Sequence, residues 1–242
     1  MLARHILLLD QKGSPWVPFL KEYFEDTSSR VHYFDHPANV SAWLAIHKAD
    51  FIFLNPAISS VNLTQKLKVF RQSCLDLRLF SVGGPDKTLA YDCIFETSPA
   101  IGQFHRLFVS QLSFLEPIRV LLVDDEKDIG YMVQEFLQDR AQPKFEVDYT
   151  PDGHMALQWL ETKKYDIAVL DVKMPILDGR DIYREIIGRK IAVPVIMFFD
   201  AISGQEISDI HQFGRPAIVD KGSSQSSMPE MLSLIKKMAY FG

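Results

Sequence analysis

The sequence predicts an α/β protein made of two tandem (βα)5 domains, each doubly wound around a five-stranded parallel sheet. Short apolar runs alternate with amphipathic helical segments along the whole chain, as parallel sheets with helices on both faces require. The alternation also occurs twice at nearly equal spacing. Two pairs of residues at the ends of apolar runs show this spacing. The interval from residue 10 to residue 55 is 45 residues, and the interval from residue 124 to residue 171 is 47 residues. We therefore predict two copies of one fold.

The second half of the chain shows the elements of one such domain most clearly. Its predicted strands are 119–124, 145–150, 166–171, 193–199 and 216–221, and its predicted helices are 127–140, 153–164, 179–190, 203–214 and 227–238. In the first helix, apolar residues recur at the spacing of one helical face. Ser203 and Glu206 form a capping-box pattern at the start of the fourth helix, and Ser227 precedes an early proline in the fifth.

The first half fits the same pattern of strands and helices. Its predicted strands are 5–10, 30–35, 50–55, 78–82 and 92–96, and a helical face over 16–24 follows the first of them. We place the domains at 1–115 and 116–242, with Pro117 as a breaker at the join. The predicted helix over 104–116 is apolar around much of its circumference. It either forms a core face alone or also packs against the second domain, a partner or a symmetry mate.

Composition and charge exclude several classes of function. The net charge is −5, and no basic stripe is present of the kind that a nucleic-acid binder needs to displace counterions. No apolar run reaches the length of a membrane span, and the N-terminus has no signal-peptide core. Cys74 and Cys93 fit no metal-binding spacing and no disulfide framework. These features predict a cytoplasmic protein that binds neither nucleic acid nor membrane.

Charged residues follow three of the predicted strands in the second half. Asp124 and Asp125 follow the first strand, Asp171 ends the third, and Lys221 follows the fifth. In open parallel sheets, ligands bind beyond the carboxyl ends of the strands, at the point where strand order reverses. Three crowded carboxylates repel one another unless a cation lies among them, and hard oxygen ligands suit Mg²⁺. We therefore expect a magnesium site at this edge of the sheet.

The segments "VLLVDDEKD", "DIAVLDVKMPILDG" and "VDKG", in this order, resemble the receiver domain of bacterial two-component response regulators, a CheY-like, flavodoxin-like fold. The resemblance covers residues from about 118 to the end. It implies that Asp171 is the phosphoacceptor and that Asp125, Asp171 and the backbone carbonyl of Lys173 bind Mg²⁺. It also implies that Asp124 holds a metal-bound water and that Lys221 pairs first with the acceptor carboxylate and then with a phosphoryl oxygen.

The sequence departs from the receiver pattern at the positions that relay phosphorylation. Receivers usually carry a Ser or Thr at the end of the fourth strand and then a small residue, but here Phe199 and Asp200 occupy these places. A shift of one residue puts Asp200 and Ala201 there instead, so no hydroxyl is present in either alignment. The aromatic residue usual in the fifth strand is Ile218. We expect intact acceptor chemistry with an altered conformational relay.

The first domain departs further, so we interpret it as a degenerate receiver, or pseudo-receiver. Asp10 is kept, but Gln11 replaces the second acid and Asn55 replaces the acceptor. Glu96 and Thr97 stand near the place of the lysine. Because an asparagine cannot form a stable acyl phosphate, we expect neither phosphotransfer nor a tight Mg²⁺ site in this domain.

The expected function is that of a response regulator and not of an enzyme. Its expected partners are a sensor histidine kinase or a histidine phosphotransfer protein, and a downstream protein target or an effector domain that this sequence does not show. A homodimer is expected by resemblance only. The alternatives are a scaffold in which Asp171 is never phosphorylated, and an aspartyl-phosphate phosphohydrolase, which normally has an acid where Lys173 stands.

Two residues near the acceptor are expected to have structural roles. Pro175 is expected to stiffen the loop after Asp171, and Gly179 is expected to allow a positive φ before the third helix.

Overall fold

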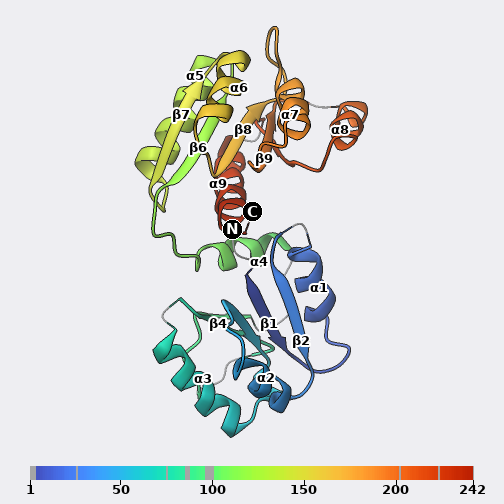
Figure 1. Cartoon of the computed structure of the whole chain (residues 1–242), viewed down its shortest axis with the longest axis vertical. Coiled ribbons are helices and arrows are strands. Elements are labelled where there is room, and N and C mark those ends of the chain that lie inside the picture. Colours follow the sequence, from blue (N-terminus) through green and yellow to red (C-terminus); the bar gives the residue numbers. More distant parts are fainter. Residues whose placement is uncertain are drawn as a thin grey trace. The chain divides into compact units, whose positions relative to one another are not determined.

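The computed structural model describes residues 4–25, 27–74, 76–84, 88–95, 101–201, 203–222 and 224–241. Contacts between Cα atoms divide the chain into two compact units: Met1–Ser113 with Phe241, and Phe114–Tyr240. Each unit contains one five-stranded sheet in which every strand pair is parallel (Figure 1). The predicted fold class, two tandem flavodoxin-like doubly wound domains, is confirmed.

The first unit alternates strands and helices from its first described strand. Its elements are β1 (His5–Leu9), α1 (Trp16–Tyr23), β2 (Arg30–Phe34), α2 (Pro37–Leu44), β3 (Phe51–Leu54), the 3-10 turn η1 (Pro56–Ile58), α3 (Val61–Ser73), β4 (Arg78–Val82), β5 (Cys93–Phe95) and α4 (Ile101–Val109).

The second unit has the same alternation. Its elements are β6 (Ile118–Val123), α5 (Lys127–Glu135), the π-helical turn η2 (Phe136–Arg140), β7 (Phe145–Thr150), α6 (Gly153–Thr162), β8 (Ile167–Asp171), α7 (Gly179–Gly188), β9 (Val195–Phe199), α8 (Gly204–His211), β10 (Ala217–Asp220) and α9 (Ser224–Phe241). The predicted capping box of α8 is present, with Ser203 and Glu206 each bonding the other's backbone N–H.

The two sheets have the same strand order, β2-β1-β3-β4-β5 in the first unit and β7-β6-β8-β9-β10 in the second. In the second unit, alternate residues of each strand point to opposite faces of the sheet, and each face is buried. Val120, Leu122 and Val169 pack with residues of α5 and α9. Leu121, Val123 and Leu170 pack on the other face with residues of α6, α7 and α8. Both faces of the strands are thus covered by helices, as their apolar composition predicts.

Several predicted helices differ from the structure at an end, and two of these differences concern the helix predicted over 104–116 and the last helix. The helix predicted over 104–116 ends at Val109, because Arg78 binds the Gln111 carbonyl at 3.2 Å and the Ser113 hydroxyl at 2.6 Å, which holds the following residues in turns. Leu115, predicted on a helical face, is 94% exposed outside the helix. The last helix begins at residue 224 and not near Ser227. Pro229 therefore lies inside it and leaves one helical hydrogen bond unmade.

No helix among the described residues is long and apolar enough to cross a membrane.

Candidate functional site

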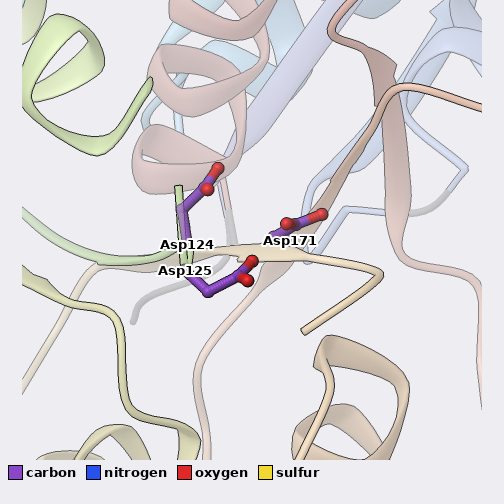
Figure 2. A group of neighbouring side chains, drawn as sticks. All are labelled: Asp124, Asp125 and Asp171. Atoms are coloured by element: carbon purple, nitrogen blue, oxygen red, sulfur yellow. The ribbon is translucent and has the colours of Figure 1, made fainter. Parts of the chain in front are cut away.

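Three carboxylates meet at the carboxyl end of the second sheet. Asp124 and Asp125 follow β6, and Asp171 is the last residue of β8, the neighbouring strand, with Val123 opposite Leu170. One oxygen from each of the three lies within 4.8 Å of the others, and Figure 2 shows the three side chains grouped at the strand ends. Strand order reverses at β6, so this is the switch point where parallel sheets bind ligands.

A single lysine bridges two of these acids. Lys221 follows β10, and its Nζ atom lies 2.8 Å from Oδ2 of Asp124 and 3.1 Å from Oδ2 of Asp171. Its position is fixed from the backbone, because the Lys221 N–H donates to the Phe199 carbonyl at 2.6 Å. The side chain is 4% exposed, so the ion pairs are shielded from solvent. The four charged groups predicted from separate parts of the sequence therefore lie together.

Burial raises the pKa of both inner acids. Desolvation raises the pKa of Asp171 to about 6, although Lys221 and the Lys173 N–H act in the opposite direction. The pKa of Asp124 is also raised by burial, against the effect of its hydrogen bond with Lys221. Desolvation alone lowers the pKa of Lys221, but its contacts with Asp124 and Asp171 outweigh burial and raise it. One lysine thus incompletely compensates the acids around it.

The acid cluster fits a small divalent cation. Asp124 and Asp171 are buried while Asp125 is half-buried, so the cluster is open to solvent on the side of Asp125. Carboxylate oxygens with room for water are the ligand set that Mg²⁺ prefers. A divalent cation here adds the positive charge that Lys221 alone does not supply. Within the described part of the chain, this is the one group of three His, Cys, Asp or Glu side chains whose ligand atoms converge in this way.

The loop after Asp171 is held to the carboxylate of Asp171 by a backbone N–H group. The Lys173 N–H donates to Oδ1 of Asp171 at 3.2 Å. The predicted positive φ at Gly179 is wrong, since the described positive-φ glycines are elsewhere and the positive φ in this loop belongs to Ile176. Gly179 is needed for space: a Cβ atom there would lie 2.1 Å from the Asp171 carbonyl oxygen. The sequence pattern thus indicated a role for Gly179 in backbone conformation, and the structure gives it a role in close packing instead.

The positions that depart from the receiver pattern lie on β9, just after it and on β10, the strand that precedes Lys221. Phe199 ends β9 and is half-buried, Asp200 follows it and is exposed, and Ile218 is half-buried in β10. The backbone of Phe199 pairs with Asp220 and its carbonyl accepts from the Lys221 N–H, so the register of β9 against β10 is fixed there. No hydroxyl is supplied by residues 199–201.

Sequence reasoning did not find a set of charged side chains near residues 199–201. The Lys173 ammonium donates to the Ala201 carbonyl at 2.8 Å and lies 3.8 Å from Oε1 of Glu206. The Arg180 guanidinium lies 3.8 Å from the same oxygen and also pairs with Asp178 at 2.6 Å. Glu206 was recognised only as a capping residue. These contacts link the loop after Asp171 to the start of α8.

The corresponding place in the first unit is filled by uncharged donors. Asp10 follows β1 and is 1% exposed. Its Oδ1 atom accepts from Nδ2 of Asn55 at 2.7 Å and from the Gln11 N–H at 2.7 Å, and its Oδ2 atom accepts from the Ser14 hydroxyl. Glu96 and Thr97, expected near the place of the lysine, lie outside the described residues.

Comparison with known proteins agrees with the geometry of the second unit. Residues 120–233 match the family described as the response regulator receiver domain. Transcriptional regulatory protein RprY of Bacteroides fragilis is 26% identical over 113 residues, covering 47% of this chain and 47% of that protein. The alkaline phosphatase synthesis transcriptional regulatory protein PhoP of Bacillus subtilis is 34% identical over 95 residues, covering 37% and 38%.

A solved structure is also similar. The receiver domain of a Pseudomonas aeruginosa sensor histidine kinase, with a magnesium ion coordinated in its active-site cleft, is 22% identical with a TM-score of 0.44. The match covers 52% of this chain and 99% of that one.

The second unit is therefore a receiver domain of the kind found in two-component response regulators, matched over residues 120–233. A phosphoacceptor role is general to that family. The match with each of the two curated regulators spans about half of the relative's length or less.

Proposed function

We propose that Asp171 accepts a phosphoryl group from a histidine kinase or a histidine phosphotransfer protein, in the presence of Mg²⁺. The observation that carries this proposal is the convergence of Asp124, Asp125, Asp171 and Lys221 at the switch point of the second sheet. Asp125, Asp171 and the Lys173 carbonyl would hold the ion directly, and Asp124 would hold it through a water molecule. When bound, the ion supplies positive charge against the charge of the incoming phosphoryl group.

The acceptor chemistry needs little from the protein beyond placement. A carboxylate oxygen of Asp171 attacks the phosphorus atom, and a P–O bond forms as the bond from phosphorus to the donor's nitrogen breaks. The electron pair of that bond stays on the leaving imidazole. The Lys221 ammonium already lies 3.1 Å from the acceptor carboxylate. It would therefore pair with an oxygen of the phosphoryl group once that group, with its negative charge, is bound to Asp171.

Deprotonation of Asp171 is part of this reaction. Burial raises its pKa to about 6, and a protonated carboxyl is a poor nucleophile. At neutral pH most of the acid is ionised even without a cation. Binding of a divalent cation would act against burial and lower the pKa of Asp171, because it stabilises the charged form.

We propose that the first unit is a pseudo-receiver that acts through protein contacts. Asn55 stands at the acceptor position and its side-chain amide donates to Asp10, so the buried carboxylate already has hydrogen-bond partners. An amide cannot accept a phosphoryl group as a carboxylate does.

We also propose that the protein passes its signal on through a target protein or a further domain.

A phosphorylation-independent scaffold is the second candidate. It is favoured by residues 199–201, which offer no hydroxyl to follow a phosphoryl group. The phosphohydrolase alternative has less support. The residue two places after Asp171 is Lys173, whose ammonium is held by the Ala201 carbonyl and lies near Glu206.

Phosphorylation of the full chain tests the proposal. The protein is incubated with acetyl phosphate and Mg²⁺, and intact mass and peptide mapping are measured, with beryllofluoride binding as a second readout. We expect one phosphoryl group on Asp171, lost in Asp171→Asn and strongly reduced in Asp125→Asn. Asp128→Asn is the matched control, because Asp128 is an exposed acid of α5 outside the cluster. No mass gain and no beryllofluoride binding would favour the scaffold.

A further inference from the structure

Two histidines of the first unit meet at the end of the sheet opposite Asp10. His5 begins β1 and His32 lies in the middle of β2. The pairing of Leu7 with His32 puts both imidazoles on one face of the sheet, since residues two apart on a strand share a face. Nδ1 of His5 lies 3.0 Å from Nε2 of His32, and the rings are stacked with centroids 5.2 Å apart.

The side chains around this pair shield it from one side. Trp43 of α2 has its ring 4.8 Å from His32 and 5.6 Å from His5, centroid to centroid. The His47 ring stacks on the Trp43 ring, with centroids 4.5 Å apart, and Nδ1 of His47 lies 3.2 Å from the Trp43 carbonyl oxygen. Both members of the pair are half-buried, so water still reaches them.

We propose that His5 and His32 form a two-ligand site for a divalent transition metal such as Ni²⁺ or Zn²⁺, with water completing the coordination. Two nitrogens bound to one metal at about 2.0–2.1 Å, with a near-right angle between them, lie about 3 Å apart. The observed separation of 3.0 Å already meets this requirement. Metal binding requires the proton shared by the two facing nitrogens to move to the other nitrogen of the donor ring, so that both facing nitrogens carry a lone pair. Rotation of the two rings would then direct both lone pairs at one ion.

The chemistry of the pair favours these metals over Mg²⁺. Imidazole nitrogen suits zinc, copper and nickel, whereas Mg²⁺ prefers oxygen. A histidine must be neutral to bind a metal. The pKa of His32 is lowered by burial and by the nearby His5, His47 and Arg30, so His32 is neutral at neutral pH. Two histidine ligands alone give a modest affinity for a metal ion. The positive charge of Arg30 repels a bound cation and lowers this affinity further.

Asp50 does not take part as a ligand. Its carboxylate already accepts from the His5 N–H at 2.7 Å and pairs with Arg4 at 3.0 Å, so it fixes the start of β1. The site consists of two imidazoles, and it is independent of the proposed acceptor chemistry in the second unit.

Isothermal titration of the full chain with Ni²⁺ and with Zn²⁺ tests this site. Saturating Mg²⁺ is present throughout to occupy the acid cluster of the second unit. We expect one transition-metal ion per chain. Binding should weaken at least about tenfold in His5→Gln and in His32→Gln, since each change removes one of two ligands.

His47→Gln is the matched control, because it alters the same aromatic group without removing a proposed ligand. Its affinity should stay within about twofold of the unchanged protein. Circular dichroism checks the fold of each variant. Binding that is equally strong without His5 or His32, or no binding at submillimolar metal, would overturn the proposal.

Fluorescence gives a second measurement that needs no histidine variant. Bound Ni²⁺ should quench the emission of Trp43, and the quenching should disappear in Trp43→Phe. Quenching that persists in Trp43→Phe would place the ion elsewhere and would also contradict the site.

Discussion

The side-chain amide of Asn55 donates to Oδ1 of Asp10 at 2.7 Å, whereas in the second unit Asp171, at the position of Asn55, is bridged to Asp124 by Lys221. Both arrangements give a partner to a buried acid that follows the first strand of a sheet. In the second unit that partner is the Lys221 ammonium, a cation beside which a second cation fits. In the first unit the partners are uncharged donors, and both oxygens of Asp10 accept hydrogen bonds.

Replacing Asn55 with aspartate should therefore destabilise the first unit. The change removes a donor from Asp10, which is 1% exposed, and puts a second carboxylate against it. We expect a loss of about 1–3 kcal/mol in the free energy of unfolding, measured by urea denaturation. Asn62→Asp is the matched control, because Asn62 is exposed in the first turn of α3 and an acid is tolerated there. Equal stability of the two variants would contradict the proposed importance of the Asn55–Asp10 hydrogen bond.

The pKa of Asp171 predicts how the stability of the second unit depends on pH without divalent ions. Burial raises this pKa to about 6, from 3.8. An acid with a raised pKa in the folded state favours folding while it is protonated, and this contribution is lost as the pH rises through about 6. Removing the charge should therefore stabilise the protein most above about pH 6, and progressively less as the pH falls towards 3.8.

We expect Asp171→Asn to be more stable than the unchanged protein at about pH 8 in EDTA, by an amount on the order of 1 kcal/mol. The difference should shrink towards about pH 5, where Asp171 is mostly protonated. Thermal unfolding followed by circular dichroism measures both conditions. Asp128→Asn should show no such dependence, and a less stable Asp171→Asn at the higher pH would contradict the sign.

The strands and the convergence of the charged cluster could be predicted from the sequence because both follow from local rules. Buried parallel strands are continuous apolar runs, and their carboxyl ends meet at one edge of the sheet. Asp124, Asp171 and Lys221 could therefore be placed together without coordinates. The end of α4 could not be predicted, because Arg78, far away in the sequence, binds the Gln111 carbonyl. Contacts of this kind leave no local pattern.

The same limit applies to side chains with two roles. Glu206 was predicted as a capping residue, and the structure has the capping box. Its contacts with Lys173 and Arg180 depend on how the loop after β8 approaches α8, which no spacing in the sequence encodes. The pairing of His5 with His32 depends likewise on which strands are neighbours and in which register.

Lys173 should hold the start of α8 near the acceptor loop. Its ammonium donates to the Ala201 carbonyl and lies near Glu206, but the side chain is 58% exposed, so the contribution is small. In Lys173→Met we expect amide hydrogen exchange in residues 203–211 to rise by about two- to fivefold, as expected for a loss of up to about 1 kcal/mol. Exchange in β8 should not change. Lys127→Met, at an exposed lysine of α5, is the control, and equal exchange in both variants would contradict the role of Lys173.

Gly179 and Gly204 allow a direct test of the space behind the acceptor. Each is the first residue of a helix that follows an N-capping side chain, Asp178 or Ser203. A Cβ atom at Gly179 would lie 2.1 Å from the Asp171 carbonyl oxygen, whereas a Cβ atom at Gly204 would meet nothing within 4 Å.

We expect Gly179→Ala to lower the free energy of unfolding by about 1–3 kcal/mol, because the backbone of Asp171 or of α7 must move. Gly204→Ala should be neutral or slightly stabilising, since alanine favours the helix over glycine. Urea denaturation measures both variants. Because the contact is with the acceptor's own carbonyl, Gly179→Ala should also slow phosphorylation by acetyl phosphate, and Gly204→Ala should not. Equal behaviour of the two variants would show that the space at Gly179 is not needed.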